Sequence, residues 1–247
     1  ARYPNQGFSN VGRVLDGRKE PGAVFRYTDD RAENWTKAED LWLYGYLENA
    51  YSDYYVGVSK VDPIQKTFTL RHGTPRGVKE APPFGGKHNK YCAYNLLEEI
   101  DLPGEYYIDR TRGILYVWPR KPAGEVTRVE LSVLDSPLVG CSNVRLESMI
   151  FENSRDMGIY EEDGENLLIR NCEFRNLGTV AIDMGRGARR RWKEQEDQSE
   201  ENILRSRIIG DVKGYMWHHP DAQRHPGKNI GIYGCLFHDL GCGGVIL

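Results

Sequence analysis

The feature that most constrains the fold is a repeat of 23 residues in the second half of the chain. The segment that begins at Asn143 matches the one that begins at Asn166, and the pattern returns at Asn229, with a weaker copy near Asn202. Such a period, with short alternating apolar runs, predicts stacked coils of β-strands, because one coil cannot bury its apolar side alone. We therefore predict a right-handed parallel β-helix over residues 136–247.

In such a stack, equivalent positions of successive coils form ladders. We expect two inward ladders, one of Met149, Cys172 and Cys235, and one of Phe151, Phe174, Ile209 and Phe237. The asparagine that begins each repeat is placed at a turn, since Asn tolerates left-handed backbone. The apolar run 243–247 leads us to expect further coils beyond Leu247.

Residues 25–135 have a different character, with most of the aromatic residues of the chain in short strand-like runs. Turn signals after Val61 and after Ile108 predict two β-hairpins. We predict a small antiparallel β-sandwich-like domain inserted before the β-helix, and a loop-like lead-in segment over residues 1–24. The expected core of the inserted domain is aromatic: Trp42, Tyr44, Tyr106, Tyr107, Tyr116 and Trp118. The predicted fold class is all-β.

Composition excludes several classes of function. The net charge of −3 provides no electrostatic surface for nucleic acid, and no apolar run is long enough to span a membrane. The five cysteines have no metal-ligand spacing, so we expect buried thiols, no metal site and no cofactor. We expect a monomer.

Several segments carry a resemblance to a known family: 2–5, 40–46, 94–101, 103–107 and 113–116, of which Leu97-Glu98-Glu99 to Pro103-Gly104-Glu105 is the most distinctive stretch. They resemble bacterial right-handed parallel β-helix repeat proteins of the pectin-lyase-like fold that include glycoside hydrolase family 141. The resemblance implies a secreted or periplasmic protein that acts on plant or algal polysaccharide, with a β-sandwich-like domain interrupting the helix. No motif for paired catalytic acids of that family matches this chain.

Candidate site residues follow from the alternation of side chains along a strand. Because Ile182 fits the inward set, Asp183 points outward, in one ladder with Tyr160, His218 and Ile246. We predict Asp183 and His218 as catalytic residues. Tyr160, together with Trp192 and His219 from two long inserts, is predicted to bind a sugar.

Three classes of function remain open at this stage, including whether the chain is an enzyme. A glycoside hydrolase needs two carboxylates in different protonation states. A polysaccharide lyase needs calcium, for which Glu161, Glu162 and Asp163 supply hard oxygen donors. The third class is a carbohydrate-binding or surface-adhesion protein without chemistry. We favour the hydrolase, with a polysaccharide or oligosaccharide as the partner.

Overall fold

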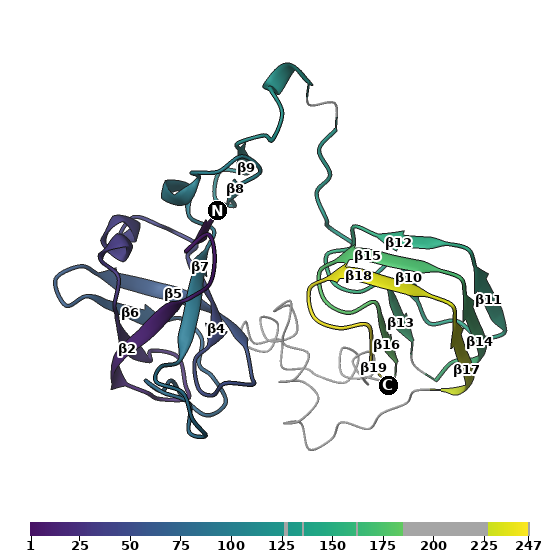
Figure 1. The fold of residues 1–247 in the computed structure, drawn as a ribbon, viewed down its shortest axis with the longest axis horizontal. Coiled ribbons are helices and arrows are strands. Elements are labelled where there is room, and N and C mark those ends of the chain that lie inside the picture. The colour runs from purple at the N-terminus through teal and green to yellow at the C-terminus, as the bar shows by residue number, and fades with distance from the viewer. Residues whose placement is uncertain (126–127, 135, 162, 185–226, 247) are drawn as a thin grey trace. The chain divides into compact units, whose positions relative to one another are not determined.

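The computed structural model describes residues 1–125, 128–134, 136–161, 163–184 and 227–246 (Figure 1). They form an all-β chain that divides into two compact units, Ala1–Arg128 and Val129–Leu247. Three short 3₁₀ helices lie in the described part of the first unit: η1 (Asp30–Trp35), η2 (Leu97–Glu99) and η3 (Ala123–Glu125).

The first unit is a closed antiparallel barrel. Its strands are β1 (Arg2–Tyr3), β2 (Ser9–Asp16), β3 (Val24–Tyr27), β4 (Trp42–Tyr46), β5 (Tyr54–Asp62), β6 (Thr67–Leu70) and β7 (Lys90–Tyr94). They follow the order β1-β7-β2-β3-β6-β5-β4, and β7 also pairs with β4, so the six strands β2 to β7 form a ring. β8 (Tyr106–Asp109) and β9 (Ile114–Val117) form a separate two-stranded sheet.

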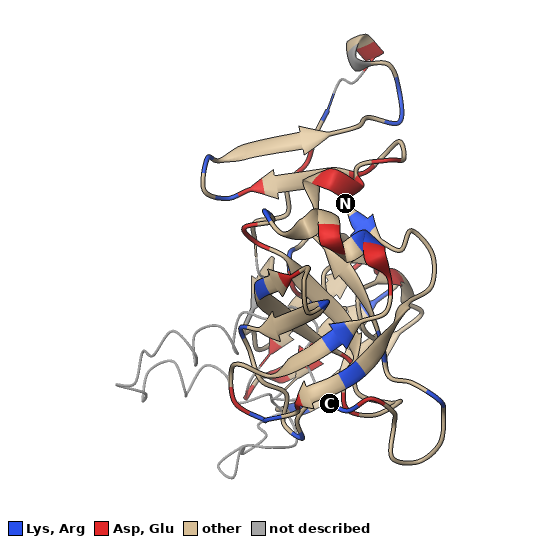
Figure 2. Cartoon of the chain, turned by 90° about the vertical axis from the view of Figure 1, so that its left-hand side faces the viewer, with Lys and Arg blue, Asp and Glu red and all other residues tan. Residues whose placement is uncertain are grey.

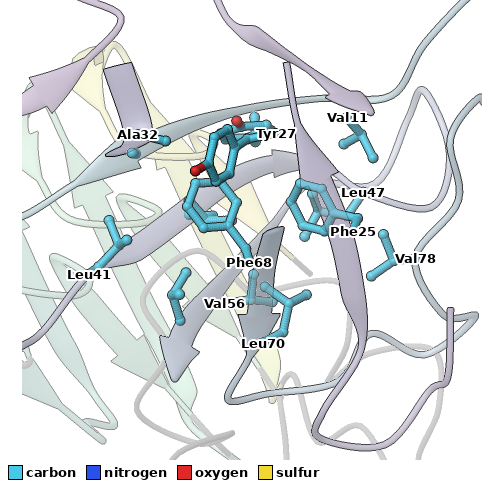
Figure 3. Close-up of a cluster of buried hydrophobic side chains, with 14 of the residues drawn as sticks. Val11, Phe25, Tyr27, Ala32, Leu41, Leu47, Val56, Phe68, Leu70 and Val78 are labelled. Atoms are coloured by element: carbon cyan, nitrogen blue, oxygen red, sulfur yellow. The ribbon is translucent and has the colours of Figure 1, made fainter. Parts of the chain in front are cut away.

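Aromatic side chains fill the barrel interior (Figure 3). The rings of Phe25, Phe68 and Tyr91 contact one another at centroid distances of 5.6 to 5.7 Å, and Trp35 from η1 stacks on Phe68 at 6.2 Å. The indole nitrogen of Trp35 donates to the buried carboxylate of Glu99 at 2.7 Å, which satisfies that acid inside the unit.

The ring closes where a glycine of β4 meets β7. A Cβ at Gly45 would lie 2.2 Å from the carbonyl oxygen of Lys90 and 2.6 Å from the Cα of Tyr91. These are backbone atoms, so β4 and β7 approach this closely only because position 45 has no side chain. The pairing runs from Trp42 opposite Tyr94 to Tyr46 opposite Lys90.

The second unit contains three short parallel sheets. The first sheet holds β10 (Leu138–Val139), β13 (Ile159–Glu161), β16 (Ile182–Met184) and β19 (Val245–Ile246). The second holds β11 (Val144–Glu147), β14 (Glu165–Arg170) and β17 (Lys228–Tyr233). The third holds β12 (Ile150–Glu152), β15 (Glu173–Leu177) and β18 (Leu236–Leu240).

The register of these sheets follows the 23-residue repeat. Phe151 pairs with Phe174 and Phe174 with Phe237, and their rings stack at 4.8 and 5.2 Å. The side-chain amide of Asn166 donates to Asn143 at 2.8 Å, across the 23-residue offset, and that of Asn229 to Asn166 at 2.7 Å. All three asparagines have left-handed backbone, with φ of 55° to 57°. The ladder of Phe151, Phe174 and Phe237 and the asparagine turns are confirmed, and Ile209 lies outside the described residues.

The predicted fold class is nevertheless wrong. The described strands of the second unit form only three separate parallel sheets of three or four strands, and do not make a right-handed parallel β-helix of the pectin-lyase-like type. The first unit is a closed barrel, and not a sandwich of two sheets, because β7 bonds to both β2 and β4. The repeat predicts which strands of the second unit pair with each other. It does not predict how many strands each sheet contains, or that the first unit closes into a barrel.

Three details of the sequence-based organisation also change. Residues 1–24, expected to be a loop-like lead-in, supply β1 and β2 to the barrel sheet. Both predicted hairpins are present, as β5–β6 and β8–β9. The expected aromatic core is wrong, since Tyr106 is 55% and Trp118 45% exposed, and Trp42 and Tyr44 are only partly buried. Met149 is likewise 46% exposed, so its inward ladder begins at Cys172.

Replacing Gly45 with alanine should weaken the closure of the barrel. The added methyl group would collide with the backbone of β7, and overpacking of this kind costs about 1–3 kcal/mol. We expect a lower urea midpoint for Gly45→Ala and faster amide exchange in β4 and β7 by mass spectrometry. Gly124→Ala is the matched control, because no atom lies within 4 Å of its added Cβ. Equal urea midpoints for Gly45→Ala and Gly124→Ala would contradict the role of Gly45 in closing the barrel.

The thiols should react in an order set by burial. Cys92 and Cys172 are 0% and 2% exposed, whereas Cys242 is exposed. Burial, with the neighbouring Glu161, raises the pKa of the Cys141 thiol to about 11, so little of the reactive thiolate is present at neutral pH. A water-soluble maleimide should label Cys242 first, as followed by peptide mass spectrometry. Rapid labelling of Cys172 in the folded protein would show that the register is wrong.

Candidate functional site: an aromatic surface of the barrel

The structure brings together part of the ladder predicted from the sequence. Tyr160 pairs with Asp183, and Asp183 pairs with Ile246, on β13, β16 and β19. Their orientation also alternates as expected, because Ile182 belongs to the main core of the unit while Tyr160 packs in a separate cluster that Ile246 joins. The expected exposure is wrong: Tyr160 is 8% and Asp183 only 1% exposed.

The other predicted site residues, His218, Trp192 and His219, lie outside the described residues. Their roles, and catalysis by Asp183, therefore stay predictions. Glu161 of the acidic turn is 1% exposed, and its carboxylate accepts a hydrogen bond from the backbone N–H of Cys141 at 2.5 Å. This side chain therefore fixes the local backbone. No group of three His, Cys, Asp or Glu side chains in the described part of the chain is placed to hold a metal ion.

The outer surface of the barrel carries a cluster of aromatic rings. Along β4, Leu43 points into the core while its neighbours Trp42 and Tyr44 point to the other side and are half-buried. Strand pairing brings the rings of Tyr55 and Tyr94 beside Tyr44, at centroid distances of 4.6 and 6.4 Å. We call the following set the aromatic face: Phe8, Trp42, Tyr44, Tyr46, Tyr55 and Tyr94.

Three phenols of this face, those of Tyr44, Tyr55 and Tyr94, keep their protons at neutral pH. Burial raises the pKa of Tyr55 to about 12, and burial also raises the pKa values of Tyr44 and Tyr94. The hydroxyl of Tyr44 donates to Asp53 at 2.9 Å, which fixes its ring. The face thus offers neutral rings with hydroxyl groups, which suit a ligand with both apolar and polar surface.

Two cations accompany one end of the aromatic face. Phe8 lies 6.1 Å from Tyr46, and the ammonium of Lys90 is 4.9 Å from the first ring centroid and 5.3 Å from the second. The guanidinium of Arg2 is 6.0 Å from Phe8 and 5.9 Å from Tyr94. These distances are those of cation–π contacts.

The loop that carries Phe8 is held in place by its neighbours. Arg2 donates to the carbonyl oxygens of Asn5 and Gly7 at 3.1 and 2.7 Å. The side chain of Asn5 donates to Asp101 at 2.8 Å. Phe8 is therefore positioned before any ligand arrives, which reduces the entropy lost on binding.

Beside Phe8 lies a polar hollow of about 610 Å³ that is open to solvent. It is lined by residues of the first loop, of β2, and of the segment that leads into η1 together with its first residue: Pro4, Gln6, Phe8, Ser9, Asn10, Thr28, Asp29 and Asp30. Amide, hydroxyl and carboxylate groups there are suitable partners for sugar hydroxyls. Phe8 belongs to both the hollow and the aromatic face.

Both carboxylates of the hollow are engaged by donors. Asp29 accepts the N–H of Arg31 at 2.9 Å and the hydroxyl of Tyr3, and so caps η1. Asp30, which is exposed, forms an ion pair with Lys66 at 2.5 Å. This arrangement can hold a polar ligand, and both carboxylates already serve contacts within the protein.

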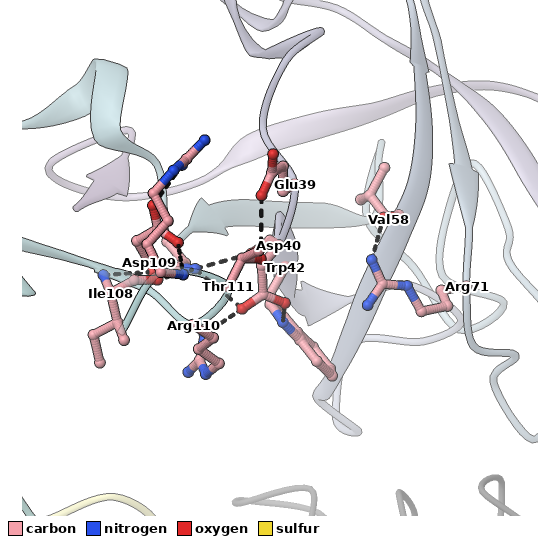
Figure 4. Close-up of polar contacts among 11 residues, drawn as sticks. Glu39, Asp40, Trp42, Val58, Arg71, Ile108, Asp109, Arg110 and Thr111 are labelled. Carbon is pink, nitrogen blue, oxygen red and sulfur yellow. Dashed lines mark hydrogen bonds and ion pairs between the residues drawn. The ribbon is translucent and has the colours of Figure 1, made fainter. Parts of the chain in front are cut away.

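A polar network fixes the other end of the aromatic face (Figure 4). The indole nitrogen of Trp42 donates to Asp40 at 2.7 Å, and its ring stacks on His72 at 5.2 Å. Asp40 also pairs with Arg110 from the turn between β8 and β9, and Asn95 donates to Asp40 at 3.1 Å. The orientation of Trp42 is thus set by groups from three parts of the unit.

This surface was not predicted from the sequence, although its signal is present there. Trp42, Tyr44 and Tyr46 alternate along one strand, which is a period-2 pattern. The intervening residues, Leu43 and Gly45, are apolar or small, so the pattern does not say which side faces inward. The predicted core placed the aromatic side inside.

Comparison with known proteins finds no matching family model, no matching curated protein and no matching solved structure. Within the described residues, no helix is long and apolar enough to cross a membrane.

Proposed function

We propose that this chain binds an oligosaccharide or polysaccharide through the aromatic face and the adjacent polar hollow of the first unit. The observation that carries the proposal is the position of Phe8, whose ring belongs to the aromatic face and also lines the hollow. Sugars present apolar ring faces and peripheral hydroxyls, so they need stacking surfaces and hydrogen-bonding groups side by side.

The proposal retains part of the function expected from the sequence. A carbohydrate ligand and a secreted or periplasmic location remain, both implied by the resemblance. Binding is favoured over hydrolysis at this surface because Asp29 caps a helix and Asp30 is ion-paired. Pre-positioning of Phe8 by Arg2 also suits recognition.

Removal of the shared ring should weaken binding. We expect Phe8→Ala to lower affinity about tenfold, which corresponds to about 1.4 kcal/mol, because a stacking surface is lost. Affinity electrophoresis in gels that contain soluble plant or algal polysaccharides measures the effect. Phe84→Ala is the matched control, since Phe84 is 86% exposed on a loop and is not part of the aromatic face. Circular dichroism checks that both variants remain folded.

Two results would contradict the proposal. The first is equal retardation of Phe8→Ala and the unaltered protein on every polysaccharide that binds. The second is the absence of binding to any polysaccharide or oligosaccharide tested at millimolar concentration.

Hydrolysis by the second unit is a further candidate, favoured by one observation. Asp183 is a buried carboxylate directly paired, strand to strand, with Tyr160. If Asp183 is catalytic, Asp183→Asn should reduce the release of reducing ends at least about a hundredfold, the lower range for loss of a general acid or base. Asp163→Asn, at an exposed turn residue, is the control. Unchanged hydrolysis in Asp183→Asn would remove this residue from the site.

A further inference from the structure

The aromatic face has an electrostatic character that the proposed function does not require. Over the first unit, acidic and basic residues are interspersed (Figure 2), and two lysines of this unit form ion pairs with carboxylates. Lys60 pairs with Asp62 at 2.9 Å, and Lys66 pairs with Asp30. Within the described residues, neither Arg2 nor Lys90 forms an ion pair with a carboxylate. The end of the aromatic face near Phe8 therefore carries two positive charges that form no salt bridge with any described residue.

These two cations differ in what they offer to a ligand. Arg2 uses both terminal nitrogens to hold the carbonyl oxygens of Asn5 and Gly7, so it contributes charge and position. Lys90 is exposed, and its ammonium makes ring contacts with Phe8 and Tyr46. Ring faces attract a cation without using hydrogen-bond acceptors, so the three N–H donors of Lys90 remain available to a ligand.

We propose that the ligand of the aromatic face is an anionic saccharide, whose carboxylate or sulfate group is bound by Lys90. This inference rests on the proposed carbohydrate-binding function and specifies its ligand class. The rings of the aromatic face contact the sugar ring, and the ammonium contacts the acidic substituent with support from the charge of Arg2. A hydrogen bond between two ionised groups is stronger than one between neutral groups, so charge discriminates between otherwise similar sugars.

The strand register explains why the lysine is at this position. Tyr46 and Lys90 are directly opposite each other in the β4–β7 pair. Side chains of directly opposed residues emerge on the same side of a sheet, so the ammonium is held beside the ring. Lys90 is thus a residue of a barrel strand and not of a loop.

The test uses a matched pair of ligands, oligogalacturonate and its fully methyl-esterified form, which differ only in the charge of the carboxyl group. By isothermal titration calorimetry with the full chain, we expect the acid form to bind about tenfold more tightly at low salt. That preference should shrink as sodium chloride is raised, because salt screens the exposed charges. Sulfated and desulfated galactan oligosaccharides form a second pair, and the pair with the larger charge preference identifies the acidic group.

The variant Lys90→Gln should abolish the preference for the acid form and leave the affinity for the methyl ester unchanged. Lys37→Gln, at an exposed lysine in the turn after η1, should retain the preference. An equal affinity for charged and uncharged partners in both ligand pairs would overturn the inference, as would a preference that survives Lys90→Gln. Binding of oligouridylate in place of every saccharide would overturn it too.

Failure of this inference can be separated from failure of the proposed function. If the neutral esters bind and Phe8→Ala weakens them, carbohydrate binding stands and only the anionic specificity is wrong. If neither member of either pair binds, the proposed function itself is wrong.

Discussion

The first unit depends on the pairing of β4 with β7, which closes the barrel. The absence of a side chain at Gly45 lets the backbones of β4 and β7 approach. The register of this pair determines which side chains face the barrel interior and which face outward. Leu43 is thereby turned into the core of the barrel, while Tyr44 and Tyr46 are turned outward. The core and the candidate binding surface both depend on this strand pair, because side chains along β4 point alternately into the core and out to the surface.

The second unit is held together in a different way. Its strands pair in parallel with their equivalents in the repeat, and at some core and turn positions like residues meet. Phe151, Phe174 and Phe237 stack ring on ring, and the asparagines at the turns bond amide to amide. Such ladders tie each strand of the second unit to the next.

Sequence patterns predicted what is local or repeated. The β5–β6 hairpin follows from turn chemistry at Asp62, whose side chain accepts the backbone N–H groups of Ile64 and Gln65. The parallel register follows from the repeat. Barrel closure was not predictable, because Tyr44 and Cys92 are far apart in sequence and no local signal joins them. The orientation of Tyr160 was predicted correctly, but its burial depends on what packs outside the strand, which alternation does not encode.

The location of the aromatic face across the seam of the barrel links recognition to mechanical integrity. A ligand that contacts Tyr46 on one strand and Lys90 on the other spans the junction where the ring closes. Any state in which β4 separates from β7 destroys that ligand site, so bound ligand disfavours opening in proportion to the logarithm of its concentration. A ligand bound there would thus stabilise the closed barrel, and the barrel would be most resistant to opening and proteolysis where that ligand is abundant.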